Sequence, residues 1–438
     1  MTQTPIEPTK QPSSTPVSDT PIRETPIRET GVSFYRLVMT SLVLKLMIGT
    51  ANQMLSPFIV IFAKGIGTTV VVLGQLIGLR SFLGLIAPLY GIWADRSGER
   101  PVLRFCIVMM SMGLFVTGSS NNVWQFGVGM FLVGISMAGT MPVIPVYLAR
   151  LLPYERLARG IGIVEYSWAL SSMVGLWLMG FVIEWTGWRT PFYLLGAITL
   201  LLWWFVGLLP AGDAEAMAKH RANHRANHRA NHQTQEQSNW RNLISKTKAF
   251  LDLGENSVSA YSTILSQSLS SLASFNILIV YGIWLTDVYG LSAIQLGTVA
   301  LVLGSFDLIG SICVSLFADS LGKRQSMMIG RWVSMIGYAV TPFVSVTLVS
   351  TVAILAFARM GFEFGIVSGI PFLTGQVPEQ RNKLLSLRSV VGTLFNTASG
   401  FLGPWLYVHY GITIVCMISA VTTALSLVLL IWKVREVN

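Results

Sequence analysis

The 438-residue chain is 52% hydrophobic and only 11% charged, whereas a soluble globular protein carries about 25% charged residues. This composition excludes an ordinary soluble domain. The net charge of +10 could suit a nucleic-acid-binding surface, but the positions of the basic residues favour a different explanation.

The first segment, residues 1–33, is rich in Pro, Thr and Ser, and TPIRE occurs twice in tandem, at 20–24 and 25–29. Such low-complexity sequence lacks the apolar content needed to fold. We expect a disordered cytoplasmic tail, and we expect no cleavable signal peptide ahead of the first apolar run.

Twelve apolar runs of about 20 residues follow, the length that crosses a bilayer as a helix. They predict an all-α membrane protein with two six-helix bundles, over 34–209 and 259–433, and a short cytoplasmic tail over 434–438. The runs are approximately 36–62, 70–93, 102–119, 124–150, 160–183, 190–209, 259–286, 292–317, 325–346, 350–376, 385–407 and 412–432.

The basic residues are distributed asymmetrically about these runs. All but five of the 30 Lys and Arg residues fall on one side; the exceptions are Lys64, Arg189, Lys45, Arg80 and Arg359. The positive-inside rule therefore places both termini and the central segment in the cytoplasm. It predicts a multi-pass protein of the plasma membrane, such as a bacterial inner membrane, and no nucleic-acid partner.

The central segment, residues 210–258, separates the two sets of six runs. HRAN repeats three times from His220, and histidines four residues apart could line one helix face and bind a metal. The alternative is a tandem-expanded linker with no metal, which the low complexity favours. Apolar and basic residues then alternate over 240–251, which predicts a short amphipathic helix on the membrane surface.

A charged turn, GIWADRSGER at 91–100, lies between the second and third runs and has a copy, SLFADSLGKR, at 315–324. Asp95 and Asp319 are 224 residues apart, and a glycine follows each aspartate by three residues. A glycine there can adopt a left-handed turn at low cost. The alternative for either turn is an ordinary basic cytoplasmic loop.

The repeat extends beyond the turns and indicates that the two halves are parallel copies. Three further pairs of residues match with a separation of 225: Pro153 with Pro378, Arg156 with Arg381, and Gly175 with Gly400. Transporters built from such repeats bind substrate near the bilayer midplane, between the halves.

With its twelve runs, two charged turns and a Gly187-Trp188-Arg189 turn, the chain resembles the major facilitator superfamily over about 34–433. The resemblance implies twelve transmembrane helices in two pseudo-symmetric bundles and transport by alternating access. It also implies that the charged turns form a conformational lock that holds the outward-open state. The lock residues are Gly91, Asp95, Arg96, Gly98, Arg100, Asp319, Gly322, Lys323 and Arg324. The second copy departs from the first, because Ser315 and Ser320 replace a glycine and an arginine.

We single out six ionisable residues inside the runs, where charge is costly and usually faces a cavity or a partner. With two neutral neighbours they form the predicted substrate and proton path: Lys45, Asn52, Gln53, Arg80, Glu165, Asp307, Arg359 and Glu363. Glu165 and Asp307 are the better proton-carrier candidates, whereas Arg359 and Glu363, four residues apart, can pair with each other. For each of the six, a structural ion pair is the alternative.

Other chemistry is not supported by the sequence. Cys106, Cys313 and Cys416 lie inside apolar runs without disulfide or zinc spacing, and no Walker motif is present. We expect no enzyme activity, no catalytic residues, no cofactor and no metal, and a monomer.

The predicted function is proton-coupled efflux of a small organic solute, because the chain resembles bacterial sugar- and drug-efflux permeases and antiporters. A proton-coupled importer of a sugar or organic anion is one alternative, and a transport-inactive membrane sensor or scaffold is another.

Overall fold

The computed structural model describes residues 34–209, 256–377 and 380–434. The predicted tails, the HRAN repeat and the predicted amphipathic helix lie outside these residues, so the predictions made for them are untested. The division into domains likewise stays a prediction.

The first half is a set of helices that cross the bundle from end to end, several of them in consecutive pieces. Their bounds are α1 Phe34–Gln53, α2 Ile59–Ile66, α3 Val70–Phe82, η1 Leu83–Ile86, α4 Ala87–Ser97, α5 Glu99–Gly118, α6 Val123–Leu151, α7 Tyr154–Glu165, α8 Ser167–Leu170, η2 Ser171–Gly175, α9 Leu176–Thr186 and α10 Thr190–Gly207.

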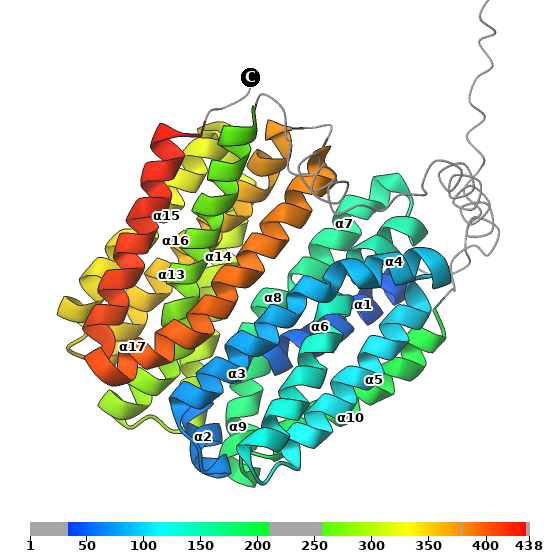
Figure 1. The fold of residues 1–438 in the computed structure, drawn as a ribbon, viewed down its shortest axis with the longest axis horizontal. Helices are drawn as coiled ribbons and strands as arrows, with labels where there is room; N and C mark the ends of the chain where they lie inside the picture. Colours follow the sequence, from blue (N-terminus) through cyan, green and yellow to red (C-terminus); the bar gives the residue numbers. More distant parts are fainter. Residues whose placement is uncertain (1–33, 210–255, 378–379, 435–438) are drawn as a thin grey trace, which may run out of the picture. The chain divides into compact units, whose positions relative to one another are not determined.

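The second half has longer, less interrupted helices. They are α13 Ser257–Tyr289, α14 Ala293–Leu321, α15 Lys323–Val344, α16 Leu348–Gln376 and α17 Arg381–Trp432. Figure 1 shows α13 to α17 gathered on the left and the helices of the first half on the right.

Ten described helical segments are long and apolar enough to cross a membrane, against the twelve spans predicted. The difference has two causes. The helix α17 contains the last two predicted spans, joined at Gly411, whose φ of 76° is not helical. The helix α15 falls short in hydropathy because it carries Lys323, Arg324 and Arg331.

Both charged turns use the backbone freedom of glycine. Gly98 has a φ of 90° between α4 and α5, and Gly322 has a φ of 87° between α14 and α15. L-residues with a side chain rarely adopt such angles, so glycine ends one helix and starts the next within a single residue. We call the end of the protein that bears Asp95 and Asp319 the turn face, and the opposite end the far face.

The two halves pack against each other along the part of the interface nearer the far face. Gly74 and Gly78 of α3 contact α17, where an added Cβ at Gly78 would lie 2.7 Å from the carbonyl oxygen of Thr397. Gly297 of α14 contacts α9, and the backbone N–H of Ala293 donates to Glu184 at 2.9 Å. Small residues allow such close helix contact within a membrane.

This contact ends before the turn face. An added Cβ at Gly84 would lie 3.1 Å from the Thr393 hydroxyl, whereas at Gly91, seven residues further on, nothing lies within 4 Å. Gly392 of α17 also faces open space. The halves are therefore closed together toward the far face and separate toward the turn face, which is uppermost in Figure 1 near α4 and α7.

The interface predicts different effects on stability for leucine substitutions at two glycines, Gly78 of α3 and Gly91 of α4. Gly78→Leu is expected to destabilise the protein by about 1–3 kcal/mol, because overpacking forces two backbones apart. Gly91→Leu is expected to leave stability unchanged, because its side chain would enter open space. Thermal unfolding of the two purified variants in detergent measures the difference, and equal losses would contradict the described interface.

Candidate functional site

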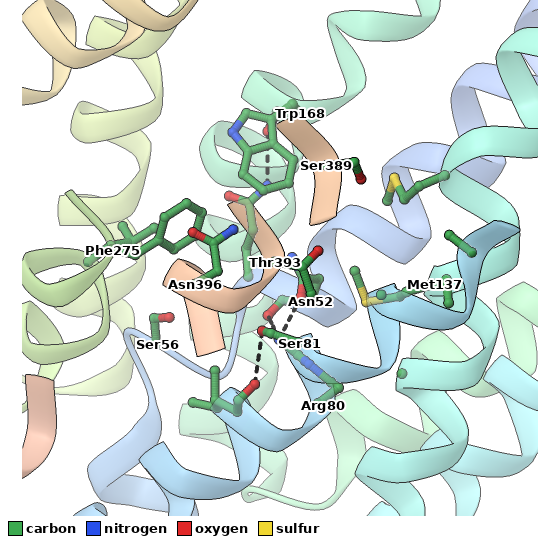
Figure 2. Close-up of a pocket in the computed structure, with 18 of the residues that line it drawn as sticks. Asn52, Ser56, Arg80, Ser81, Met137, Trp168, Phe275, Ser389, Thr393 and Asn396 are labelled. Carbon is green, nitrogen blue, oxygen red and sulfur yellow. Dashed lines mark hydrogen bonds between the residues drawn. The ribbon is translucent and has the colours of Figure 1, made fainter. Parts of the chain in front are cut away.

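A cavity of about 490 Å³ lies between the two halves, and we call it the central cavity. One wall comes from α1, α3, α4, α6 and α8, and the other comes from α13 and α17 (Figure 2). The polar residues that line it are Asn52, Gln53, Ser56, Arg80, Ser81, Ser389, Thr393 and Asn396, and the larger apolar ones are Met137, Met141, Trp168 and Phe275. Its volume suits a small organic molecule.

Three predicted path residues, Asn52, Gln53 and Arg80, lie on the cavity wall formed by the first half. Arg80 donates from Nη2 to the Asn52 side-chain oxygen at 2.6 Å, and the Gln53 amide donates to the Trp168 carbonyl at 3.2 Å. Figure 2 shows Arg80 and Asn52 together at the cavity, with Trp168 on the opposite side of the view. These contacts fix the orientation of the polar groups on α1, α3 and α8.

The second half contributes two polar groups that were not singled out from the sequence, Ser389 and Thr393. Ser389, Thr393 and Asn396 of α17 all line the cavity. Along the helix they are four and then three residues apart. This spacing places them on one helix face, and a search for neutral polar residues at helical spacing within the span would have found them. Gln267 and Asn276, in contrast, are buried and do not line the cavity.

A buried ion pair lies next to the central cavity. Arg359 of α16 donates from Nε to Asp307 Oδ1 of α14 at 3.0 Å and from Nη2 to the other carboxylate oxygen, while Nη1 donates to Ser274 at 3.0 Å. Asp307 is 3% exposed and Arg359 is 6% exposed. Such a two-point contact is among the strongest that a carboxylate makes.

A small void connects this pair with the cavity wall. Its volume is about 10 Å³, enough for about one water molecule. Asp307 and Arg359 line the void, and so do Gln53 and Trp168, which also line the central cavity. The ion pair and the cavity are therefore separated by a single layer of side chains.

The predicted pairing of Arg359 with Glu363 is wrong for this structure. Glu363 instead accepts a hydrogen bond from the Ser311 hydroxyl at 3.1 Å, and no described ion pair joins it to Arg359. Their spacing along α16 allows the contact, but the guanidinium points toward α14, where Asp307 offers two oxygens.

The predicted burial of Glu165 is also wrong. Its carboxylate pairs with Lys45 Nζ at 2.6 Å, yet its side chain is 55% exposed while that of Lys45 is 8% exposed. Glu165 is the last residue of α7, on the part of the interface where the halves separate. The two carboxylates predicted as proton-carrier candidates therefore have different environments, since Asp307 is buried and Glu165 is half exposed.

The first charged turn contains an ion network that the sequence did not reveal. Arg150, at the end of α6, contacts Asp95 at 3.0 Å and Glu99 at 2.9 Å. The Asp95 side chain is 54% exposed, whereas that of Glu99 is 2% exposed. All three residues belong to the first half, so in this state the turn is bonded within its own half.

The second charged turn lacks this network. Asp319 is exposed and takes part in no ion pair among the described residues. Gly375, 225 residues after Arg150, occupies the corresponding place in the repeat. Arg324 instead donates to the carbonyl oxygens of Leu430 and Ile431 at 3.1 and 3.2 Å, at the end of α17.

One buried charge was not among the residues singled out from the sequence. Arg331 of α15 is 2% exposed and donates from Nε to the Ser426 hydroxyl at 2.7 Å. It lies away from the central cavity, so its role is in packing α15 against α17.

Comparison with known proteins places this geometry in a family. The family model described as Major Facilitator Superfamily matches residues 42–259 and 263–438. An uncharacterised MFS-type transporter, YceJ, of Bacillus subtilis is 24% identical over 81% of this chain and 86% of its own length.

Two further relatives have more specific names. The sialic acid transporter NanX of Escherichia coli is 21% identical over 78% of this chain and 79% of its own length. The multidrug resistance protein MdtG of Klebsiella pneumoniae is 24% identical over 39% of this chain and 43% of its own length.

Among solved structures, a D-xylose-proton symporter has the same fold. Its TM-score is 0.70 at 16% identity, and the match covers 92% of this chain and 99% of the symporter.

Proposed function

Because the chain belongs to the major facilitator superfamily, we propose that it is a secondary active transporter that moves a small organic solute by alternating access, coupled to protons. The observation that supports this most is the central cavity between two halves that are in contact on one side only. A scaffold protein would not need a polar cavity at the contact between two repeats.

The distribution of lysine and arginine predicts that the turn face is cytoplasmic. This orientation decides toward which side of the membrane the cavity opens. The halves then separate toward the cytoplasm and close toward the outside. Alternating access would be completed by closing the turn face and opening the far face around the cavity. In that closed state the charged turns could bond between the halves, as the proposed conformational lock requires.

We propose that Asp307 couples the movement of protons to the transport of the solute. Burial disfavours an ionised carboxylate unless a cation pairs with it, so separation of Asp307 from Arg359 would favour uptake of a proton. The neighbouring void offers a route for that proton by way of water. Glu165 is the less suitable carrier, because its side chain is 55% exposed and pairs with Lys45 outside the buried Asp307–Arg359 cluster.

We propose that the protein exports its solute, in keeping with the relative named for multidrug resistance. Import of a sugar or organic anion is the second candidate, which the relative named as a sialic acid transporter favours.

Proton movement in liposomes tests this proposal before the substrate is known. Purified protein would be reconstituted with a pH-sensitive dye inside, and a panel of sugars, organic acids and drug-like cations would be added outside. A protein-dependent pH change with at least one solute is expected, and its sign separates symport from antiport. A scaffold would give no solute-dependent signal with any compound.

Orientation is tested by labelling from outside the cell. Cysteine placed at Thr68, between α2 and α3 on the far face, is expected to react with a membrane-impermeant maleimide, whereas cysteine placed at Ser97 on the turn face is not. Both variants would be made in a background that lacks Cys106, Cys313 and Cys416. Labelling at Ser97 with protection at Thr68 would reverse the proposed orientation.

A further inference from the structure

The charge of the central cavity points to the class of substrate. Arg80 is the only charged residue among the described residues that line the cavity. No Asp or Glu belongs to that lining. A site for a cation would carry a carboxylate, whereas a single guanidinium with no acidic neighbour favours an anionic ligand.

The guanidinium of Arg80 is buried but incompletely bonded. The residue is 7% exposed, and Nη2 is held by Asn52 at 2.6 Å. Nη1 has no hydrogen-bond acceptor, and no ion pair reaches Arg80 among the described residues. Arg359, in contrast, is buried to the same degree and has Asp307 as a counter-charge.

An unpaired buried cation is costly within a membrane. Arg331 is also buried without a counter-charge among the described residues, but it lies away from the cavity. Arg80 differs because it lines the cavity, where an anionic ligand could pair with it. Arg80 lines the cavity with one nitrogen fixed by Asn52. Nη1 has no partner among the residues that the structure describes and is closed to solvent in this state, so a carboxylate would bind it only after the side chains around it move.

The remaining lining of the cavity, on both walls, suits the rest of such a ligand. Trp168 and Phe275 offer apolar and aromatic surface, while Thr393 and Asn396 offer hydroxyl and amide groups (Figure 2). The Asn396 side-chain oxygen has no hydrogen-bond donor among the described residues. A ligand with an acidic group at one end and hydroxyl or amide N–H groups at the other would satisfy both.

We propose that the substrate is a small organic acid whose carboxylate binds Arg80. This inference rests on the proposed function, because it takes the central cavity as the substrate site. It makes Arg80 a binding residue, whereas Asp307 and Arg359 would serve coupling.

A purely structural role for Arg80 is the competing explanation, since its bond to Asn52 joins α3 to α1. The two explanations differ in one respect. A structural arginine would affect every ligand equally, whereas a carboxylate-binding arginine would affect acids and not their neutral analogues.

Ligand-dependent thermal stabilisation of the purified protein tests this difference. The probes are matched pairs that differ in charge: nicotinate and nicotinamide, benzoate and benzamide, gluconate and sorbitol, and N-acetylneuraminate and its methyl ester. We expect at least one acid to stabilise the protein while its neutral partner does not. Arg80→Gln is expected to weaken that acid's binding by about 10- to 100-fold.

The matched control is Arg331→Gln, which removes a second buried arginine away from the cavity. It is expected to keep the selectivity for acids even where its own melting temperature falls. If Arg80→Gln does not fold, Arg80→Lys retains the charge without the planar guanidinium. This variant is expected to bind the acid more weakly and still reject the neutral partner.

Three outcomes would overturn the inference: no acid stabilises the protein, acids and neutral partners stabilise it equally, or Arg80→Gln binds the acid as the unmodified protein does. These results are separable from failure of the proposed function. Binding in detergent requires neither proton coupling nor transport, and proton flux with a neutral solute would support transport while rejecting the acid.

Discussion

Asp307→Asn is expected to abolish accumulation of substrate driven by a pH gradient while leaving substrate exchange across the membrane largely intact. The asparagine resembles the protonated carboxylate in shape but cannot take up or release a proton. Exchange needs no net proton movement, so it should continue. The measurement compares gradient-driven uptake with counterflow in proteoliposomes, with the solute that gives proton flux.

The contacts of Asp307 explain why the expected effect is large. Its carboxylate is buried and bonded at two points by Arg359, which Ser274 also holds. Removing the negative charge leaves Arg359 without a counter-ion, which is the condition that proton uptake would create during the cycle.

Glu165→Gln is the comparison variant, because it removes the other candidate carboxylate, which is 55% exposed and is paired with the buried Lys45. It is expected to retain most gradient-driven transport. If Asp307→Asn keeps full accumulation, Asp307 is not the coupling residue and Glu363 becomes the next candidate. If Asp307→Asn loses exchange as well, the pair has a structural role.

Arg150→Gln is expected to have the second large effect, on both stability and transport. It would leave Glu99 as a buried carboxylate without a counter-charge, and breaking a buried pair in this way costs about 3–5 kcal/mol. Thermal unfolding is expected to show the loss. The double variant Arg150→Gln with Glu99→Gln should recover most of it, because neither residue then carries an unpaired charge.

Asp95→Asn separates stability from transport at the same turn. The Asp95–Arg150 contact is exposed in this state, so its loss should cost less than about 1 kcal/mol. Transport should nevertheless fall strongly if Asp95 bonds between the halves when the turn face closes. Asp319→Asn should do less, since Asp319 has no described ion pair. Equal transport defects in the two variants would contradict the asymmetry of the turns.

Much of the architecture could be predicted from the sequence, because span length and basic-residue placement follow from the properties of the bilayer. The membrane fold was predicted in this way, and the family was predicted from the resemblance of the charged turns; both are confirmed. Arg331 was not singled out although it lies inside the predicted run 325–346, because hydropathy does not show which side chains of a span are buried between helices.

The site was less predictable, since it depends on which helices meet. Spacing along α16 suggested that Arg359 would pair with Glu363, but only the packing of α14 beside α16 shows that Asp307 is the closer partner. Hydropathy placed Glu165 inside a predicted membrane span. It could not show that the halves separate at that depth and expose the carboxylate.

Distances measured by spin labels on both faces test the central claim, that the two halves alternate around the cavity, most directly. One pair would join Ser97 and Leu385 across the turn face, and the other would join Lys64 and Val288 across the far face. In liposomes we predict that conditions which shorten the first distance lengthen the second, as pH and substrate are varied. A single unchanging distance at both faces under every condition would contradict alternating access in this protein.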